Sequence, residues 1–137
     1  MKLVINKCFG GFGLSEAGMR RYFELKGWSL YIENTSSWSV TYWKVPPEDR
    51  PVEPKPWATA TLEDRQRFND ECRKKAVYDN DIPRDAPELV RVVEELGSAA
   101  NGSYAELTVV EIPDGAEWQI EEYDGNEHVA EKHRIWR

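Results

Sequence analysis

Apolar and polar positions in the first part of the chain predict a strand, a helix and a hairpin. The apolar run from Lys2 to Cys8 is typical of a short buried strand. A helix is expected to follow an N-cap at Ser15 and to end at Gly27, with apolar residues at helical spacing in between. Aromatic and β-branched residues then alternate over 28–32 and 38–45, which predicts the two strands of a hairpin.

The middle of the chain predicts a loop and two helices. Five prolines stand between positions 46 and 56, which excludes a helix or a central strand. We therefore expect a proline-rich surface loop at about 46–57, either a lid or a connector. Thr61 opens a capping-box pattern before a charged helix that runs to about Ala76 and carries only a narrow apolar stripe. Asp85 is the expected N-cap of the most strongly patterned helix, which ends near Leu96.

The end of the chain predicts strands separated by glycine turns. The segments 107–112 and 118–123 have strand patterns, whereas 127–136 fits either a strand or a helix, with a strand favoured. The predicted order is β-α-β-β-α-α-β-β-β. The predicted fold class is therefore α+β: a single domain over residues 1–137, with a mixed β-sheet of about five to six strands flanked by about three helices.

Composition and charge narrow the possible functions. A length of 137 residues fits one compact domain that needs no disulfide or metal support. The net charge of −7 disfavours nucleic-acid binding, unless the basic residues gather on one face. No signal-like or membrane-length apolar segment is recognisable, so the cytosol is the expected compartment. Cys8 and Cys72 are far apart and form neither a metal motif nor a C-x-x-C pair, and no cofactor is predicted.

The glycine-rich segment 8–15 joins the first predicted strand to the first helix and is the main candidate site. Glycines at a strand-to-helix turn allow the backbone N–H groups to bind an anion. The segment lacks the third glycine of G-x-G-x-x-G and the lysine of a Walker loop. The alternative is a tight turn whose phenylalanines pack into the core. Under the binding hypothesis, an aromatic ring stacks on a base and an arginine balances the charge. The candidate ligand-binding residues are Phe9, Gly10, Gly11, Phe12, Gly13, Leu14, Ser15, Arg84, Tyr123, His133 and Arg134.

Two blocks of sequence resemble a widespread group of small proteins encoded by bacteriophages. The first is residues 4–15, VINKCFGGFGLS, and the second comprises EIPDG at 111–115, EEYDG at 121–125 and EHVAEKHR at 127–134. The likeness also includes 81–84 and the helix at 89–97. It implies a phage origin, action in the cytoplasm of the bacterial host and an anti-defence role, and it carries no catalytic residues over.

Three functions remain open from the sequence. The leading hypothesis is a non-enzymatic binding protein that captures a small anionic ligand, such as a nucleotide-derived host defence signal. The second is a protein-interaction module that inhibits a host factor through aromatic residues such as Trp38, Trp43 and Trp57. The third is a small nucleotide-modifying hydrolase that uses Cys8, Glu131 or His133, although the scarcity of histidine argues against an enzyme. No metal site and no catalytic set is predicted, and a homo-oligomer is expected.

Overall fold

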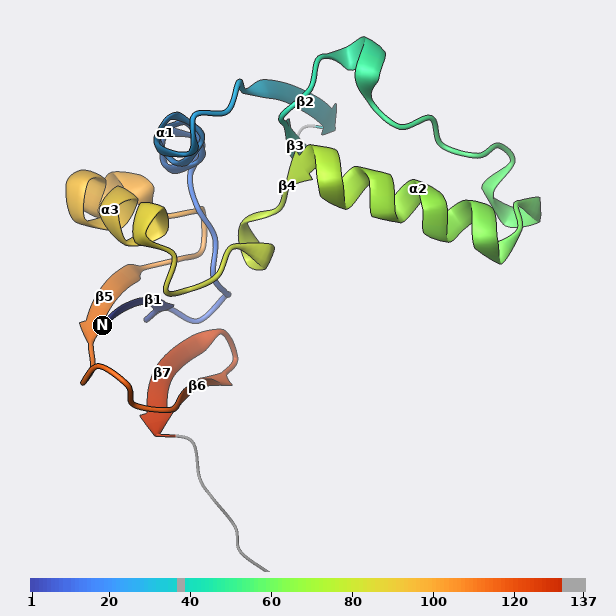
Figure 1. The fold of residues 1–137 in the computed structure, drawn as a ribbon. Coiled ribbons are helices and arrows are strands. Elements are labelled where there is room, and N and C mark those ends of the chain that lie inside the picture. The colour runs from blue at the N-terminus through green and yellow to red at the C-terminus, as the bar shows by residue number, and fades with distance from the viewer. Residues whose placement is uncertain (37–38, 132–137) are drawn as a thin grey trace, which may run out of the picture. The chain divides into compact units, whose positions relative to one another are not determined.

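The computed structural model describes residues 1–36 and 39–131, and these residues contain three α-helices and seven strands. The predicted α+β class is confirmed. Chain contacts divide the protein into two compact units (Figure 1). The terminal unit comprises residues 1–26 and 82–137, and the central unit comprises Gly27–Asp81. The central unit is thus an insertion between two segments of the terminal unit, and the single domain expected over residues 1–137 stays a prediction.

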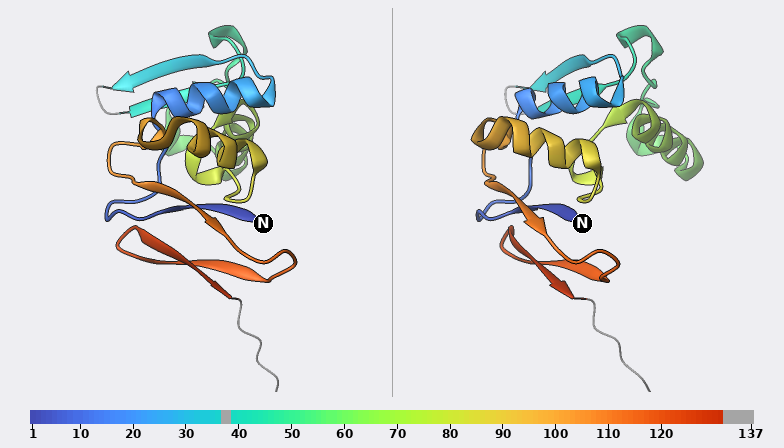
Figure 2. Two further views of the ribbon diagram at one scale, coloured as in Figure 1. Left: turned by 90° about the vertical axis from the view of Figure 1, so that its left-hand side faces the viewer. Right: turned by 60° about the vertical axis from the view of Figure 1, so that its left-hand side comes forward.

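The terminal unit is built around two paired strands. Strand β1 (Lys2–Asn6) pairs antiparallel with β5 (Leu107–Glu111), although about a hundred residues separate them in sequence. Helix α3 (Pro87–Leu96) contacts both strands and also packs against α1 (Glu16–Lys26). Figure 2 shows this succession of α1, α3 and the strand pair in both views. The core between them consists of buried apolar residues: Leu3, Val4, Ile5, Met19, Tyr22, Phe23, Leu89, Val90, Val92, Val93 and Leu107.

A β-hairpin covers the other side of the β1–β5 pair. Strands β6 (Trp118–Tyr123) and β7 (Asn126–Glu131) pair antiparallel, and β7 contacts β1 (Figure 2). Because β1 is covered on both faces, its central residues form a continuous apolar run rather than an alternating one. The strand favoured for 127–136 is confirmed as far as Glu131, and residues 132–136 lie outside the described part of the chain.

The prediction of one mixed sheet was wrong in its arrangement. The described strands form three small sheets, and every pairing within them is antiparallel. The edge of β1 that faces away from β5 is already occupied, which explains why β7 does not extend the first sheet. There the Val4 N–H donates to the Arg84 carbonyl oxygen, and the Asn6 N–H donates to the Glu127 carboxylate. These donors are therefore used by a loop and a side chain instead of a neighbouring strand.

The predicted ends of α1 are confirmed, whereas the predicted start of α3 is not. The Ser15 hydroxyl oxygen accepts a hydrogen bond from the Gly18 N–H at 3.1 Å, and Gly27 follows α1 with a φ of +73°. These two residues bound the helix as predicted. The predicted N-cap of α3 was wrong, since Ala86 takes that position without a side-chain hydrogen bond and Pro87 begins the helix. Proline suits the first helical position because its missing N–H would have no helical partner there.

The central unit contains the predicted hairpin. Strands β2 (Tyr31–Ser36) and β3 (Ser39–Trp43) pair antiparallel, and the two-residue strand β4 (Ala76–Val77) adds to β3. Helix α2 (Leu62–Lys75) leads directly into β4 (Figure 1). Thr61 is its N-cap, and the Thr61 hydroxyl oxygen accepts from the Asp64 N–H at 3.0 Å. The capping box thus marks the helix start as predicted.

A tryptophan and an ion pair stabilise the sheet of the central unit. Trp43 is buried, and its indole N–H donates to Glu33 at 3.2 Å. The other oxygen of Glu33 accepts from Arg50, whose guanidinium lies 5.4 Å from the centre of the Trp43 ring. Burying the indole with its N–H satisfied avoids the cost of an unpaired donor. Trp43 therefore serves the interior of this unit and not an outer contact surface.

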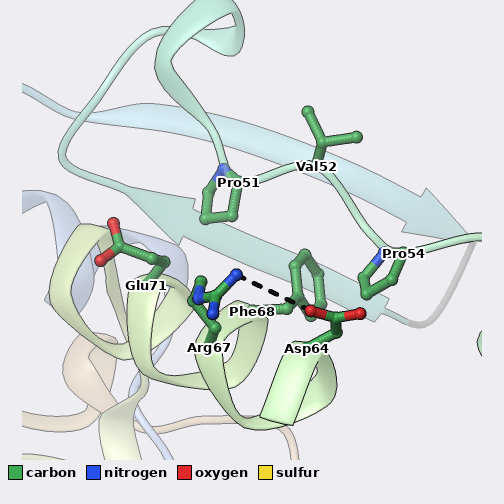
Figure 3. A pocket seen from close by; sticks show the side chains of 7 residues that line it. All are labelled: Pro51, Val52, Pro54, Asp64, Arg67, Phe68 and Glu71. Atoms are coloured by element: carbon green, nitrogen blue, oxygen red, sulfur yellow. Dashed lines mark ion pairs between the residues drawn. The ribbon is translucent and has the colours of Figure 1, made fainter. Parts of the chain in front are cut away.

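The proline-rich segment 46–57 contains neither an α-helix nor a strand, only turns of 3-10 helix at Pro47–Asp49 and from Trp57. Figure 3 shows Pro51 and Pro54 lying over α2, where they line a pocket of about 320 Å³ with Phe68 beneath them. Val52 points away from the helix and is 89% exposed. The Trp57 ring contacts the Phe68 ring edge to face, with 5.9 Å between centroids. The segment is thus attached to α2 at several points.

Candidate functional site

The glycine loop, residues 8–15, is in backbone contact with the turn between β6 and β7. Gly10 and Gly11 have φ angles of +131° and +110°, which side-chain-bearing residues rarely adopt. The Gly10 N–H donates to the Asp124 carbonyl oxygen at 3.1 Å. A Cβ atom on Gly125 would lie 2.8 Å from the Gly10 nitrogen and collide with the Gly11 nitrogen. The two segments approach this closely because neither has a side chain at the contact.

The loop also contacts the segment that precedes β5. The Gly102 N–H donates to the Gly13 carbonyl oxygen at 2.9 Å, and a Cβ on Gly102 would lie 2.9 Å from the Gly13 carbonyl carbon. A Cβ on Gly10 would lie 2.8 Å from the Cβ of Tyr104. The glycine loop is therefore enclosed between two other segments, and its glycines permit this packing.

Several N–H groups that a bound anion would need already have acceptors within the protein. The Ser15 N–H donates to the Ala100 carbonyl oxygen at 2.9 Å, and the Gly18 N–H donates to the Ser15 hydroxyl. That hydroxyl in turn donates to the Ala99 carbonyl oxygen at 2.5 Å. An anion at the start of α1 would have to displace these bonds, so the tight-turn alternative gains support over an open anion site. The part of that alternative that packs the phenylalanines into the core is wrong for Phe9, which is 59% exposed.

Asn6, at the end of β1, connects the glycine loop to two other segments. Its side chain is fully buried, and its amide nitrogen donates to the carbonyl oxygens of Cys8 and Gly125, both at 2.8 Å. Its amide oxygen accepts from the N–H groups of Cys8 at 3.2 Å and Glu106 at 2.8 Å. All four hydrogen-bonding positions of the amide are thus filled, and a fully satisfied buried amide rigidifies its surroundings.

Arg84 and Glu127 form an ion pair beside the same loop. The two guanidinium Nη atoms donate to the two carboxylate oxygens at 2.6 and 2.8 Å, and the Glu127 side chain is only 4% exposed. The Arg84 guanidinium also lies 3.8 Å from the centre of the Phe12 ring. Burial alone would raise the pKa of Glu127, but the bonds from Arg84 and Asn6 outweigh it and hold that pKa below its ordinary value. Glu127 is therefore ionised at neutral pH and neutralises Arg84.

Three exposed aromatic side chains stand around Gly10, and we call them the aromatic surface: Phe9, Tyr104 and Tyr123. They are 59%, 75% and 79% exposed. The rings of Phe9 and Tyr123 meet edge to face with 6.4 Å between centroids, and Tyr104 packs against Gly10 through its Cβ. Each comes from a different segment of the chain. The hydrogen bonds of Asn6 and the glycine contacts hold those three segments together.

Most of the predicted site residues lie near the glycine loop, but their side chains form separate contacts and not one binding site. Phe9 meets Tyr123, and Phe12 meets Arg84. Leu14 is buried and forms an isolated bridge with Asn101, so its side chain belongs to the core. The other two candidates, His133 and Arg134, lie outside the described residues.

His128, a histidine within the described residues, pairs with an exposed glutamate on the neighbouring strand. His128 on β7 lies opposite Glu121 on β6, with 3.0 Å between Nε2 and the carboxylate, and both side chains are at least half exposed. Within residues 1–36 and 39–131, no three His, Cys, Asp or Glu residues are grouped so that they could hold a metal ion. Nor does any helix in this range have the length and apolar character needed to cross a membrane.

Sequence reasoning missed three residues of this region: Asn6, Glu127 and Tyr104. A polar residue at the end of the apolar run of β1 was a usable signal for Asn6, because such a residue must find partners when buried. Nothing in the sequence distinguishes Glu127 from the exposed glutamates around it. Tyr104 follows the Asn101-Gly102 turn signal, which indicates a surface position and gives no information on its neighbours.

We compared the chain with models of known protein families, with curated proteins and with solved structures, and found no match in any of the three.

Proposed function

We propose that the protein is a non-enzymatic binding protein and that it contacts a partner protein through the aromatic surface. The observation that carries the proposal is the exposure of Phe9, Tyr104 and Tyr123 around a single glycine, at 59%, 75% and 79%. Clustered exposed aromatic residues are unusual on a monomer and are typical of contact sites. Tyrosine and phenylalanine are enriched in protein interfaces, where they bury much area at small entropic cost.

The packing beneath the aromatic surface supports the proposal. The Phe9 segment is bonded to the Tyr123 segment through Gly10 and Asp124. Asn6 bonds to both of these segments and to Glu106, two residues from Tyr104. A contact surface fixed in advance loses little freedom on binding, so more of its contact energy contributes to affinity.

Charge favours a partner protein over a phosphate-rich ligand. Asp124 and Glu106 are exposed beside the aromatic surface, and the whole chain carries a net charge of −7. A partner with a basic rim would complement these carboxylates, which raises association rates and selectivity. With the phage origin that the resemblance implies, the partner would be a host protein in the bacterial cytoplasm, and binding would inhibit it.

Photo-crosslinking tests this proposal in lysate of a bacterial host. A photoreactive phenylalanine analogue at position 123 should give one predominant host adduct, whereas the same analogue at the exposed position of Tyr31 should not. The combined substitutions Phe9→Ala and Tyr104→Ala should abolish the adduct and leave the circular dichroism spectrum unchanged. Adducts of equal yield from both positions, or an adduct that survives the double substitution, would exclude this surface as the contact site.

A second candidate function is the capture of a small anionic or nucleotide-type ligand at the glycine loop. The observation that favours it is the group of rings and charge at this loop, where Arg84 covers Phe12 and Phe9 meets Tyr123. A base could stack on these rings. Calorimetry with a panel of cyclic and linear oligonucleotides tests it, as does mass spectrometry of ligands released from denatured protein. Binding that is lost in Phe9→Ala would support capture, and no binding across the panel would exclude it.

The expected homo-oligomer is tested separately, by light scattering, which measures the mass of the particle in solution.

A further inference from the structure

The apolar stripe of helix α2, which the proline-rich segment covers in part at Phe68, also borders a cavity. None of the helix's fourteen side chains, all of which are described, is buried, although Phe68 and Cys72 lie on one face at helical spacing. This face borders a cavity of about 690 Å³, roughly twice the volume of the pocket in Figure 3. Such a volume lies within the range of sites that hold small organic ligands, about 300–1,000 Å³. The stripe therefore has room for a ligand against it.

The walls of this cavity combine aromatic rings with hydrogen-bonding groups. Phe68 on α2 and Tyr78, which follows β4, supply rings, and Tyr78 is 40% exposed. Asn69 and Asn80 supply amides, and neither side chain forms a hydrogen bond with the rest of the described protein. An amide offers both donors and an acceptor, as the edge of a heteroaromatic ring does. The cavity therefore offers aromatic side chains on which a heteroaromatic ligand could stack, and amide side chains that could hydrogen-bond to the edge of the ligand ring.

Two residues of opposite charge also line the cavity, the carboxylate Asp81 and the cation Arg73. Arg73 lines it and is exposed, and its guanidinium forms no ion pair with any described residue. The two lysines that follow differ, because Lys74 and Lys75 both pair with Glu71 at 3.5 Å. Arginine binds phosphate and carboxylate groups in a two-point geometry, so an unpaired guanidinium at a cavity wall favours an anionic substituent on the ligand.

We propose that the cavity lined by Phe68, Asn69, Arg73, Tyr78 and Asn80 binds a small molecule with a planar heteroaromatic ring and an anionic group, the chemistry of a nucleoside monophosphate. The ring lies against the aromatic walls, the amides bind its edge, and Arg73 binds the anionic group. This site is lined only by residues of the central unit and does not depend on the aromatic surface of the terminal unit.

Calorimetry with AMP, GMP, CMP and UMP as probes tests the proposal on the full chain. At least one probe should bind with one-to-one stoichiometry. The substitution Arg73→Gln should weaken that binding at least tenfold, since a charge-assisted hydrogen bond to an anion is much stronger than a neutral one. Lys74→Gln is the matched control, because Lys74 is the next residue, has the same charge and does not line the cavity; its affinity should stay within twofold of the wild type.

Cysteine alkylation gives a second readout that locates the bound probe. Cys72 lines the cavity, and burial together with the nearby carboxylates of Glu33, Glu53 and Glu71 raises the pKa of its thiol. Its reaction with iodoacetamide is therefore slow enough to follow by mass spectrometry. A saturating probe should slow the labelling of Cys72 at least fivefold and leave that of Cys8, in the terminal unit, unchanged.

Three results would overturn the proposal. These are the failure of all four nucleotides to bind, equal affinities of the wild type and Arg73→Gln, and unchanged Cys72 labelling at saturation. Binding that is lost in Phe9→Ala but kept in Arg73→Gln would place the probe at the glycine loop and would likewise exclude the cavity. Loss of the host adduct from position 123 would leave the cavity proposal unaffected.

Discussion

The two carboxylate oxygens of Glu127 accept hydrogen bonds from the two Nη atoms of Arg84 at 2.6 and 2.8 Å, and one of them also accepts from the Asn6 N–H at 2.8 Å. Glu127 belongs to β7, Asn6 ends β1, and Arg84 precedes α3. One buried carboxylate thus joins three segments of the terminal unit that are distant in sequence. The aromatic surface depends on the relative placement of these segments.

We expect Glu127→Gln to destabilise the terminal unit strongly. The substitution leaves the Arg84 guanidinium half buried without its counter-charge, and breaking a buried ion pair costs about 3 kcal/mol. Urea unfolding measures the difference. Glu94→Gln is the control, because Glu94 pairs with Lys2 at 3.0 Å on the surface, where the loss should stay below about 1 kcal/mol. Similar losses in both variants would mean that the Glu127 pair stabilises the fold no more than a surface pair does.

The same carboxylate should make stability depend on pH in acid. Its pKa in the folded protein is lowered below the ordinary value of 4.5, so the unfolded state binds the proton more tightly. The stabilisation is therefore fully present above pH 4.5 and is lost as the pH falls through the lower folded pKa. We expect the difference in unfolding free energy between wild type and Glu127→Gln to be constant above about pH 6 and to shrink toward pH 3. A difference that stays constant over this range would contradict the assigned shift.

Local features of the fold could be predicted because they depend on neighbouring residues. The N-caps at Ser15 and Thr61 and the glycine at Gly27 each fix a helix end through a few backbone atoms. Asp85 misled the prediction because Pro87 determines where α3 can begin, and that places the N-cap at Ala86. The turn at Asp124-Gly125 was likewise predicted, whereas 127–136 fitted a helix as well as the favoured strand, and its pairing with β6 was not predicted.

Contacts between distant segments could not be predicted. No pattern in the sequence indicates that β1 pairs with β5 or that Glu127 occupies the edge of β1. These two contacts are the reason why the strands form three small sheets and not the single mixed sheet that was predicted. The contacts of the candidate site could not be predicted for the same reason. The glycines near Gly10 were recognised, but the sequence does not reveal that Gly125 and Gly102 pack against them. The insertion of the central unit could not be predicted either, because it follows from contacts between residues 1–26 and 82–137, which lie far apart in the sequence.

We expect Gly125→Ala to disrupt the contact between the glycine loop and the β6–β7 turn. Its φ of +89° alone makes alanine unfavourable by about 1–2 kcal/mol, and the added Cβ would also collide with the backbone of Gly11. Gly115→Ala is the matched control, because its φ is +80° and nothing lies within 4 Å of the added atom. Urea unfolding should show a loss for Gly125→Ala that exceeds the control by a further 1–3 kcal/mol or so. Equal losses would show that close packing at Gly125 contributes nothing to stability.

We expect Ser15→Ala to destabilise α1 more than Thr61→Ala destabilises α2. Both hydroxyls cap a helix, at 3.1 Å from Gly18 N and 3.0 Å from Asp64 N, and loss of such a cap costs about 1 kcal/mol. The Ser15 hydroxyl also donates to the Ala99 carbonyl oxygen, so its loss leaves a second group unpaired and should cost about 1 kcal/mol more.

Ser15→Asp separates the two contributions of the hydroxyl. An aspartate can accept from the Gly18 N–H but cannot donate to Ala99, so hydrogen exchange at the Gly18 amide should remain slow while overall stability falls to an intermediate value. Amide exchange followed by NMR, together with urea unfolding, distinguishes these outcomes. If Ser15→Asp were as stable as the wild type, the bond to Ala99 would be dispensable. The start of α1 would then be fixed by the cap alone, and its N–H groups would be freer to meet a ligand than the hydrogen bonds to Ala99 and Ala100 imply.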